Sequence, residues 1–463
     1  MAASILTIYI DGERVNLYFN DFEMTWGACV EITQNISAGF SVDENGYVLY
    51  QNRFLVKEGS TQYITTSDYI NGSGDSYQTV KPAKHGAYIG ASGVAHKVKK
   101  IYVGVSSIAR KVKKAYIGVG GVARLCFSGE PEVKYYGTLA DLQKSVRFLS
   151  ATSIGNYALF AGGLTNAEPT NALTVYDNSF VKFMTGTLSG KSAASSMAAA
   201  SNPKYAIFSG GETSSGSSRT SIAYDAALTK TSPDTMYEAR RRHAGGSIGN
   251  YVVFAGGYYS GYLDSVESYD DSLTHNSSIE KLWVAREQIC AATAGNYIMF
   301  AGGYANGNAK TSIDAYNTSL TRVSSPSFTY GKGNIGAVSF GNYALFPPGE
   351  ANVSATGAST TIECYDSSLT KVMLPSLPEA SVGLKGASVN EFALLGGGYR
   401  GASNEGSNKV YSFDNSLTLK EEQSMTNVRY QHAATTVGNA VLFGGGFTTG
   451  SYTTASVEAY QVV

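Results

Sequence analysis

Two histidines occur at the same place in a repeated sequence, and imidazole nitrogen is a common ligand of zinc and copper. His243 follows Arg240-Arg241-Arg242, and His432 follows Arg429-Tyr430-Gln431. They belong to the third and seventh of seven copies, which lie nearly opposite each other if the copies close into a ring. One ion with ligand distances of about 2 Å would not join them. The chain has five histidines and no CxxC spacing among its four cysteines. We therefore expect no metal, no cofactor and no disulfide framework, and structural or channel-lining roles for both histidines.

Four carboxylates also recur in matching phase, Glu267 with Asp314 and Glu363 with Glu458. Most glycoside hydrolases use two carboxylates, about 5 Å apart or about 6.5–9.5 Å apart. The spacing places these four on one kind of strand and singles out no pair. The GxSxG, HExxH, phosphate-loop and dinucleotide-binding motifs are absent from the sequence. We expect a protein that is not an enzyme, with a polysaccharide hydrolase or lyase as the alternative.

Charge and hydropathy argue against several classes of partner. The 463 residues carry 35 Lys+Arg and 36 Asp+Glu, for a net charge of -1. Such a balance is atypical of nucleic-acid binders and of proteins that bind anionic membranes. The N-terminus lacks the basic start and apolar block of a signal peptide, and no apolar run reaches membrane-spanning length. We expect a soluble product made in the cytoplasm, with no signal peptide, no nucleic-acid partner and no membrane insertion.

A nine-residue segment that usually ends in Gly-Gly recurs with its ends 46 to 49 residues apart. The seven copies are GNYALFAGG ending at Gly163, PKYAIFSGG at Gly211, GNYVVFAGG at Gly257, GNYIMFAGG at Gly303, GNYALFPPG at Gly349, NEFALLGGG at Gly398 and GNAVLFGGG at Gly446. An unbroken apolar stretch such as YALF is typical of a strand buried on both faces, and Gly-Gly is a turn signal. A period this regular predicts stacked, repeated sheets.

A second signature follows in each copy, an aromatic residue that usually precedes Asp. Its members are Tyr176-Asp177, Tyr224-Asp225, Tyr269-Asp270, Tyr316-Asn317, Tyr365-Asp366, Phe413-Asp414 and Tyr460-Gln461. The last copy stops after Tyr460 and lacks an outermost strand. The segment 132–139, EVKYYGTL, stands where the other copies place that strand. It is predicted to complete the seventh sheet and so to close the ring, which leaves only short edges.

Together these repeats resemble the kelch repeat, in which a strand ending in Gly-Gly precedes a later Tyr-Asp. The resemblance covers about residues 133–463 and implies a seven-bladed β-propeller. Two features depart from it: Pro348 replaces a glycine in the fifth copy, and the usual Trp of the outermost strand is missing from nearly every copy. The copper site of galactose-oxidase-like members would need His, Tyr and a cross-linked Cys, for which the five scattered histidines give little support.

The first part of the chain has its own organisation. Residues 1–84 show alternating runs separated by turns such as Asp11-Gly12 and Asn45-Gly46, which predict hairpins in a small β domain. Residues 85–130 hold three 14-residue repeats that begin at Ala87, Ile101 and Ala115, each predicted to form a hairpin. These repeats are similar to segments of tail and other virion-associated proteins of phages and prophages of Gram-positive hosts. The resemblance implies that the N-terminal region attaches to a virion. Residues 131–463 are the predicted propeller.

Loop topology predicts a binding face. In a four-stranded antiparallel blade, the loop after Gly-Gly and the connection to the next blade lie on the same face. Variable loops on a rigid scaffold that carry Tyr and Arg make a plausible recognition surface. The candidate residues are Tyr258, Tyr259, Tyr262, Tyr304, Tyr399, Arg400, Phe447 and Tyr452 after Gly-Gly, and Arg240, Arg241, Arg286, Arg429 and Tyr430 in the connections.

The sequence as a whole favours an all-β phage or prophage adhesin of the tail-fibre or receptor-binding type, located in the virion. Its propeller would bind a bacterial-surface glycan or protein, and its N-terminal region a tail component. Whether it forms a homo-oligomer is left open, because no heptad run predicts one. The alternatives are the hydrolase or lyase named above and an intracellular kelch-like scaffold for a protein partner.

Overall fold

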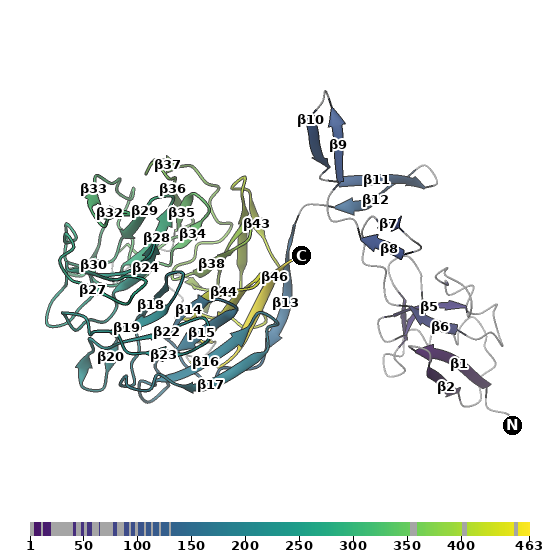
Figure 1. Cartoon of the computed structure of the whole chain (residues 1–463), viewed down its shortest axis with the longest axis horizontal. Helices are drawn as coiled ribbons and strands as arrows, with labels where there is room; N and C mark the ends of the chain where they lie inside the picture. Colours follow the sequence, from purple (N-terminus) through teal and green to yellow (C-terminus); the bar gives the residue numbers. More distant parts are fainter. Residues whose placement is uncertain are drawn as a thin grey trace. The chain divides into compact units, whose positions relative to one another are not determined.

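The chain forms two compact units, residues 1–130 and 131–463 (Figure 1). The computed structural model describes residues 131–351, 359–400, 405–448 and 452–463 of the second unit. Of the first unit it describes the strands, with few of their side chains, and Ile64. Every regular element described is a strand. Accordingly, this part of the chain has no helix long and apolar enough to cross a membrane.

The first unit contains a six-stranded sheet and three separate hairpins. The sheet has the order β2-β1-β6-β5-β4-β3, formed by β1 (Ser4–Ile10), β2 (Glu13–Phe19), β3 (Phe40–Val42), β4 (Val48–Tyr50), β5 (Arg53–Lys57) and β6 (Tyr77–Val80). The hairpins are β7 (Tyr88–Ala91) with β8 (Val94–Lys97), β9 (Ile101–Val105) with β10 (Ile108–Val112), and β11 (Lys114–Val119) with β12 (Val122–Ser128). Each 14-residue repeat thus forms one hairpin, as the sequence predicts.

The second unit is a seven-bladed β-propeller in which every blade is a four-stranded antiparallel sheet. Blades 1 to 3 are β14 (Ser150–Ile154), β15 (Tyr157–Ala161), β16 (Ala172–Asp177) and β17 (Lys182–Thr187); β18 (Ala198–Ser201), β19 (Ala206–Ser209), β22 (Ser221–Tyr224) and β23 (Lys230–Thr231); and β24 (Ala244–Ile248), β25 (Tyr251–Ala255), β26 (Val266–Tyr269) and β27 (His275–Asn276). Blades 4 and 5 are β28 (Cys290–Ala294), β29 (Tyr297–Ala301), β32 (Ile313–Asn317) and β33 (Arg322–Val323); and β34 (Val338–Phe340), β35 (Tyr343–Phe346), β36 (Glu363–Tyr365) and β37 (Lys371–Val372).

Blades 6 and 7 complete the ring. Blade 6 is β38 (Lys385–Val389), β39 (Phe392–Gly396), β42 (Val410–Asp414) and β43 (Leu419–Glu421), and blade 7 is β44 (Ala433–Val437), β45 (Ala440–Gly444), β46 (Val457–Val462) and β13 (Val133–Leu139). Short two-stranded ribbons extend three of the loops: β20 (Glu212–Thr213) with β21 (Gly216–Ser217), β30 (Tyr304–Ala305) with β31 (Asn308–Ala309), and β40 (Tyr399–Arg400) with β41 (Glu405–Gly406).

The predicted closing strand is present. β13 pairs antiparallel with β46, from Val133 opposite Val462 to Leu139 opposite Val457. The N-terminal strand of the unit therefore supplies the outermost strand of the last blade. The same junction is closed again near the axis, where the N–H of Phe148 in blade 1 donates to the carbonyl of Gln431 in blade 7 at 2.9 Å.

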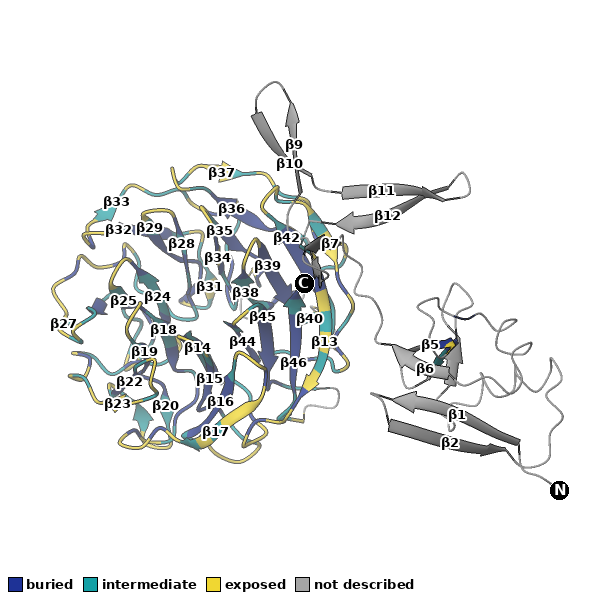
Figure 2. Cartoon of the chain, turned by 45° about the vertical axis from the view of Figure 1, so that its right-hand side comes forward, coloured by how far each residue is buried: buried dark blue, intermediate teal, exposed yellow. Residues whose placement is uncertain are grey.

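Apolar side chains between neighbouring blades form the core. The second strand of each blade is buried on both faces, as Leu159 and Phe160 illustrate in β15. Phe160 packs in one cluster with Leu442 of the adjoining blade. Figure 2 shows the middle strands buried and the loops and outer strands more exposed. The innermost strands of blades 1, 4 and 7 alternate between buried and half-buried residues, because every second side chain faces the central channel.

The Tyr-Asp signature is structural. The Tyr316 hydroxyl donates to the carbonyl of Glu280 at 2.8 Å, which ties the third strand of the blade to the connection that precedes the blade. The Asp270 carboxylate accepts the N–H groups of Ser272 and Thr274, both at 2.8 Å. This hydrogen-bonded turn places Leu273 in the left-handed region, at a φ of 61°.

The loops after Gly-Gly and the blade-to-blade connections lie on one face of the disc, called the loop face below. In all seven blades an isolated bridge joins the two segments where the loop begins, as Arg241 pairs with Tyr258 and Tyr430 with Phe447. The turn between the first and second strands of a blade, such as the one at Asn156, lies on the opposite face.

Candidate functional site

Seven equivalent residues, one before each innermost strand, surround the axis of the propeller on the loop face. They are Phe148, Ser196, Arg242, Gln288, Asn334, Gly383 and Gln431, and each has a left-handed backbone, with φ between 48° and 70°. Six of them are not glycine, although this conformation disfavours side chains. A chain of backbone hydrogen bonds supports them: each of Ser196, Arg242 and Gln288 donates its N–H to the carbonyl of the preceding member, at 2.7 to 3.0 Å.

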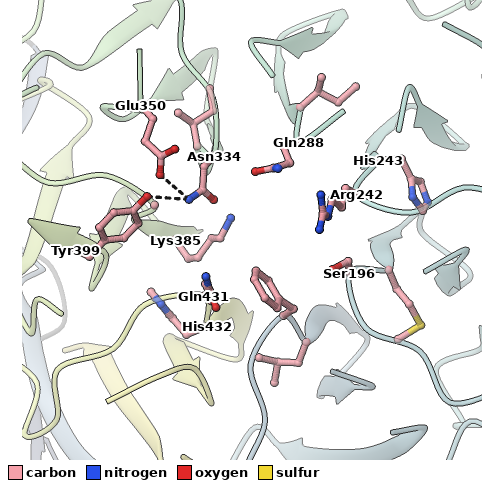
Figure 3. Close-up of a pocket in the computed structure, with 16 residues that line it drawn as sticks. Ser196, Arg242, His243, Gln288, Asn334, Glu350, Lys385, Tyr399, Gln431 and His432 are labelled. Atoms are coloured by element: carbon pink, nitrogen blue, oxygen red, sulfur yellow. Dashed lines mark hydrogen bonds between the residues drawn. The ribbon is translucent and has the colours of Figure 1, made fainter. Parts of the chain in front are cut away.

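These seven residues line a cavity of about 390 Å³, called the axial hollow below. Its other lining residues include Glu350, Lys385, Tyr399, His243 and His432, with Leu149, Met197, Ile289 and Ile335. Figure 3 shows the amides of Gln288 and Gln431, the guanidinium of Arg242 and the ammonium of Lys385 directed toward its middle. The wall is therefore rich in hydrogen-bond donors and acceptors.

Glu350 is the one carboxylate among the described residues that line the hollow. One of its oxygens accepts a hydrogen bond from the Tyr304 hydroxyl at 2.5 Å, and the other accepts one from the Asn334 amide at 3.1 Å. The same amide nitrogen lies 3.3 Å from the Tyr399 hydroxyl. This network joins blades 4, 5 and 6 and fixes the orientation of Asn334 and Tyr399 (Figure 3).

An aromatic platform, formed by Tyr399, Tyr430 and Phe447, adjoins the hollow. The ring centroids of Tyr399 and Tyr430 are 5.6 Å apart, and those of Tyr430 and Phe447 are 5.2 Å apart. All three side chains are half-buried. The Arg147 guanidinium lies over Phe447 at 4.3 Å and donates to the Gln431 side-chain oxygen at 3.4 Å. The structure thus brings together three residues that the sequence placed on the face and connects them to the hollow through Tyr399.

A second aromatic group lies in blade 3. Tyr258 and Tyr262 are in edge contact at 5.5 Å, and Arg241 lies over Tyr258 at 5.2 Å. Tyr259 beside them is exposed. Of the remaining loop candidates, Tyr452 is exposed, and Arg400 is exposed and forms an ion pair with Glu379 at 2.7 Å.

Three arginines expected on the face lie in the core instead. The side chains of Arg240, Arg286 and Arg429 are 0% exposed, so they are not available to a ligand. Each pairs with the carboxylate on the third strand of its own blade: Arg240 with Glu267, Arg286 with Asp314 at 2.8 Å, and Arg429 with Glu458 at 2.7 Å. Blade 5 uses Lys332 with Glu363, 3.5 Å apart, at the same place.

These buried pairs explain the recurring acids. Arg286 also donates to the carbonyl of Gly302 at 2.8 Å, and the N–H of Trp283 donates to Asp314 at 2.9 Å. One ion pair therefore holds the Gly-Gly turn, the third strand and the incoming connection together. The four carboxylates are at most 1% exposed, and none of them lines the axial hollow. Tyr304 is likewise 1% exposed and acts through its hydrogen bond to Glu350.

The two histidines pack as core residues in the wall of the hollow. His243 lies 5.8 Å from the Phe254 ring, and His432 lies 6.0 Å from the Phe443 ring. Neither ring has a hydrogen-bond partner on either nitrogen in the described structure. Burial lowers the pKa of both well below the usual range, so they are neutral near pH 7. Among the described residues, no group of three His, Cys, Asp or Glu side chains could hold a metal ion.

The polar side chains around the hollow were not among the residues predicted from the sequence. A signal was available, because an amide stands two residues after the buried cation in three copies: Arg286-Glu287-Gln288, Lys332-Gly333-Asn334 and Arg429-Tyr430-Gln431. Lys385 carries no comparable signal, since it is exceptional at its place in the repeat. The place of Glu350 holds Glu in one other copy, at Glu212, so that position alone does not single out Glu350.

No protein-family model matches the chain, and no curated protein matches it. Among solved structures, the chain is similar to one titled "Structure of YjhT". The TM-score is 0.45 at 12% sequence identity, and the match covers 58% of this chain and 97% of that chain.

Proposed function

We propose that the propeller is a binding module whose loop face recognises a glycan of a bacterial surface, and that the chain acts as a virion-associated adhesin. The observation that carries the first part is the aromatic platform of Tyr399, Tyr430 and Phe447 beside the polar axial hollow. The resemblance of the three hairpin repeats to tail proteins carries the second. A surface protein is the other receptor that such a face would fit.

The platform and the hollow supply the two kinds of contact that a sugar needs. The C–H faces of a pyranose pack against aromatic rings, which contribute large contact areas with little loss of side-chain freedom. Amide and carboxylate groups donate to and accept from neighbouring hydroxyls. Such groups are provided within one cavity by Gln288, Asn334, Gln431 and Glu350. Its volume of about 390 Å³ is within the range of small-ligand sites, about 300–1,000 Å³.

We propose binding rather than hydrolysis because the carboxylate in the hollow already accepts hydrogen bonds from the protein. Both oxygens of Glu350 accept hydrogen bonds from protein donors, a state that orients the group for recognition. The four acids that recur in the repeat form ion pairs with Arg or Lys side chains in the core.

Binding of the full chain to a bacterial glycan array and to intact cells tests the proposal. Replacing Tyr399 and Tyr430 together by Ala removes most of the platform. Loss of an aromatic anchor commonly costs about 2 kcal/mol, roughly a thirtyfold loss of affinity. Asn296→Ala, in an exposed turn of the opposite face, is the control and should bind like the wild type.

Three results would contradict the proposal. They are unchanged binding by the platform variant with loss in Asn296→Ala, release of reducing ends from a bound polysaccharide, and failure to bind any glycan or cell. The first would place the site on the other face of the disc. The second would favour the hydrolase alternative.

A further inference from the structure

Lys385 is exceptional among its equivalents in the seven blades. The second residue after the left-handed position is small in the other six: Ser150, Ala198, Ala244, Cys290, Gly336 and Ala433. Blade 6 alone places a long cationic side chain there. Gly336 permits blade 6 to approach, since a Cβ at Gly336 would lie 2.3 Å from the Leu384 carbonyl oxygen.

The ammonium of Lys385 faces the hollow and has no partner among the residues that the structure describes. It lines both the axial hollow and the adjoining deeper part of the channel, a cavity of about 230 Å³. Among the described residues it makes no ion pair or hydrogen bond, whereas the buried cations of blades 3, 4, 5 and 7 each have a carboxylate. The loop segments 352–358, 401–404 and 449–451, which lie outside the described residues, contain no Asp or Glu.

Other donors converge on the same space. Arg242 lies on the wall of the hollow, where it forms an ion pair with the Glu287 carboxylate at 3.5 Å, and its side chain is directed inward in Figure 3. The hydrogen bond from Arg147 is accepted by the oxygen of the Gln431 amide, and no acceptor within the described part of the chain engages its NH₂ group. Burial lowers the pKa of Lys385, and Cys290 acts in the opposite direction. An anion beside the ammonium would offset this desolvation.

We propose that Lys385 and Arg242 form a site for an anionic substituent, a carboxylate or a phosphate, on the glycan that the loop face binds. This inference rests on the proposed function and adds the chemical class of the ligand. The amide of Gln431 adds a hydrogen bond to the same group, while the platform holds the sugar ring. An isolated ammonium at the axis would then have a role that none of the paired cations has.

Three sugars that differ only at C6 test the site: D-glucuronate, D-glucose 6-phosphate and D-glucose, each titrated calorimetrically into the full chain. At least one charged sugar should bind at least tenfold more tightly than glucose, and which one does so separates carboxylate from phosphate recognition. Lys385→Ala introduces the residue found at Ala198, Ala244 and Ala433, so it should fold and should lose that preference. Lys204→Ala, in the turn between β18 and β19 on the opposite face, should keep it.

The wild type should also melt at a higher temperature with the preferred sugar, and Lys385→Ala should not. Equal binding of the three sugars, no binding of either charged sugar, or an unchanged preference in Lys385→Ala would overturn the anion site. Binding to the glycan array that still depends on Tyr399 and Tyr430 would leave the proposed function standing. If array binding does not depend on Tyr399 and Tyr430 and no charged sugar is preferred, both the anion site and the proposed function are rejected.

Discussion

Blades 6 and 7 are neighbours with the same strand order, yet they use their cation differently. In blade 7, Arg429 is buried and paired with Glu458 at 2.7 Å. In blade 6 the equivalent of Arg429 is Ser381, whose hydroxyl lies 3.4 Å from the Gly397 carbonyl, and the cation Lys385 stands four residues later, on the hollow. The difference shows that a cation matched by a carboxylate on the third strand is part of the blade architecture. A cation without that carboxylate is a candidate for binding.

The two blades also differ in how they are assembled, and this difference predicts the largest effect. Blade 6 comes from one continuous segment, whereas blade 7 takes its outermost strand, β13, from the start of the unit. Deleting residues 1–128 should leave a folded propeller. Deleting residues 1–142 should expose the edge of β46 and also remove the buried Val133 and Leu139. We expect loss of cooperative unfolding or aggregation in the longer deletion, measured by thermal melting and light scattering. Equal melting temperatures would show that the closing strand contributes nothing.

Breaking the ion pair of blade 7 should have the next largest effect. Arg429→Met leaves Glu458 buried without its cation, and loss of one partner of a buried pair costs about 3–5 kcal/mol. Urea unfolding of the variant should show this loss. Replacing both partners, by Met at position 429 and Leu at position 458, should recover much of the stability, because no unpaired charge is then buried. If Arg429→Met is as stable as the wild type, the ion pair does not contribute to the stability of the blade.

The sequence was sufficient to predict the features that repeat. The blade count, the Gly-Gly turns and the closing strand follow from local patterns that recur in phase, and the structure confirms them. The position of Arg240, Arg286 and Arg429 could not be read in this way. Their burial depends on Glu267, Asp314 and Glu458, which lie 27 to 29 residues later in the sequence. The recurrence of these acids was visible, but their partners were not.

The axial hollow depends on a still less local property. Its side chains converge because seven strand entries adopt a left-handed backbone around one axis. No propensity scale predicts that conformation for Arg242, Gln288 or Gln431, since these residues are ordinary in any other backbone. The platform shows the same limit: Tyr399, Tyr430 and Phe447 were predicted singly, and only the fold shows that their rings touch.

Lys191 differs from both Arg429 and Lys385. It is a buried cation that has no carboxylate partner among the described residues. It is 3% exposed, and its ammonium donates to the Thr220 carbonyl at 2.7 Å and to the Ser218 hydroxyl at 3.5 Å. Burial lowers its pKa to about 7. Between that value and the ordinary 10.5, the unfolded chain binds a proton that the folded chain does not. This group therefore makes the protein more stable as pH rises through that window and less stable as pH falls to 7.

Lys191→Met removes this dependence, and here we expect the smallest effect, a change of about 1 kcal/mol between pH 8 and pH 7 in the stability of the variant relative to the wild type. The change should favour Met at the lower pH, because the wild type must there bury a charge or give up a proton. Loss of the bond to Thr220 works against the variant at every pH and so does not alter the slope. Urea unfolding at several pH values measures the difference, with Lys230→Met, an exposed lysine of β23, as the control. If the variant and the wild type differ in free energy of unfolding by the same amount at both pH values, Lys191 is not desolvated. The lack of a carboxylate would then not be enough to lower the pKa of a cation in this fold.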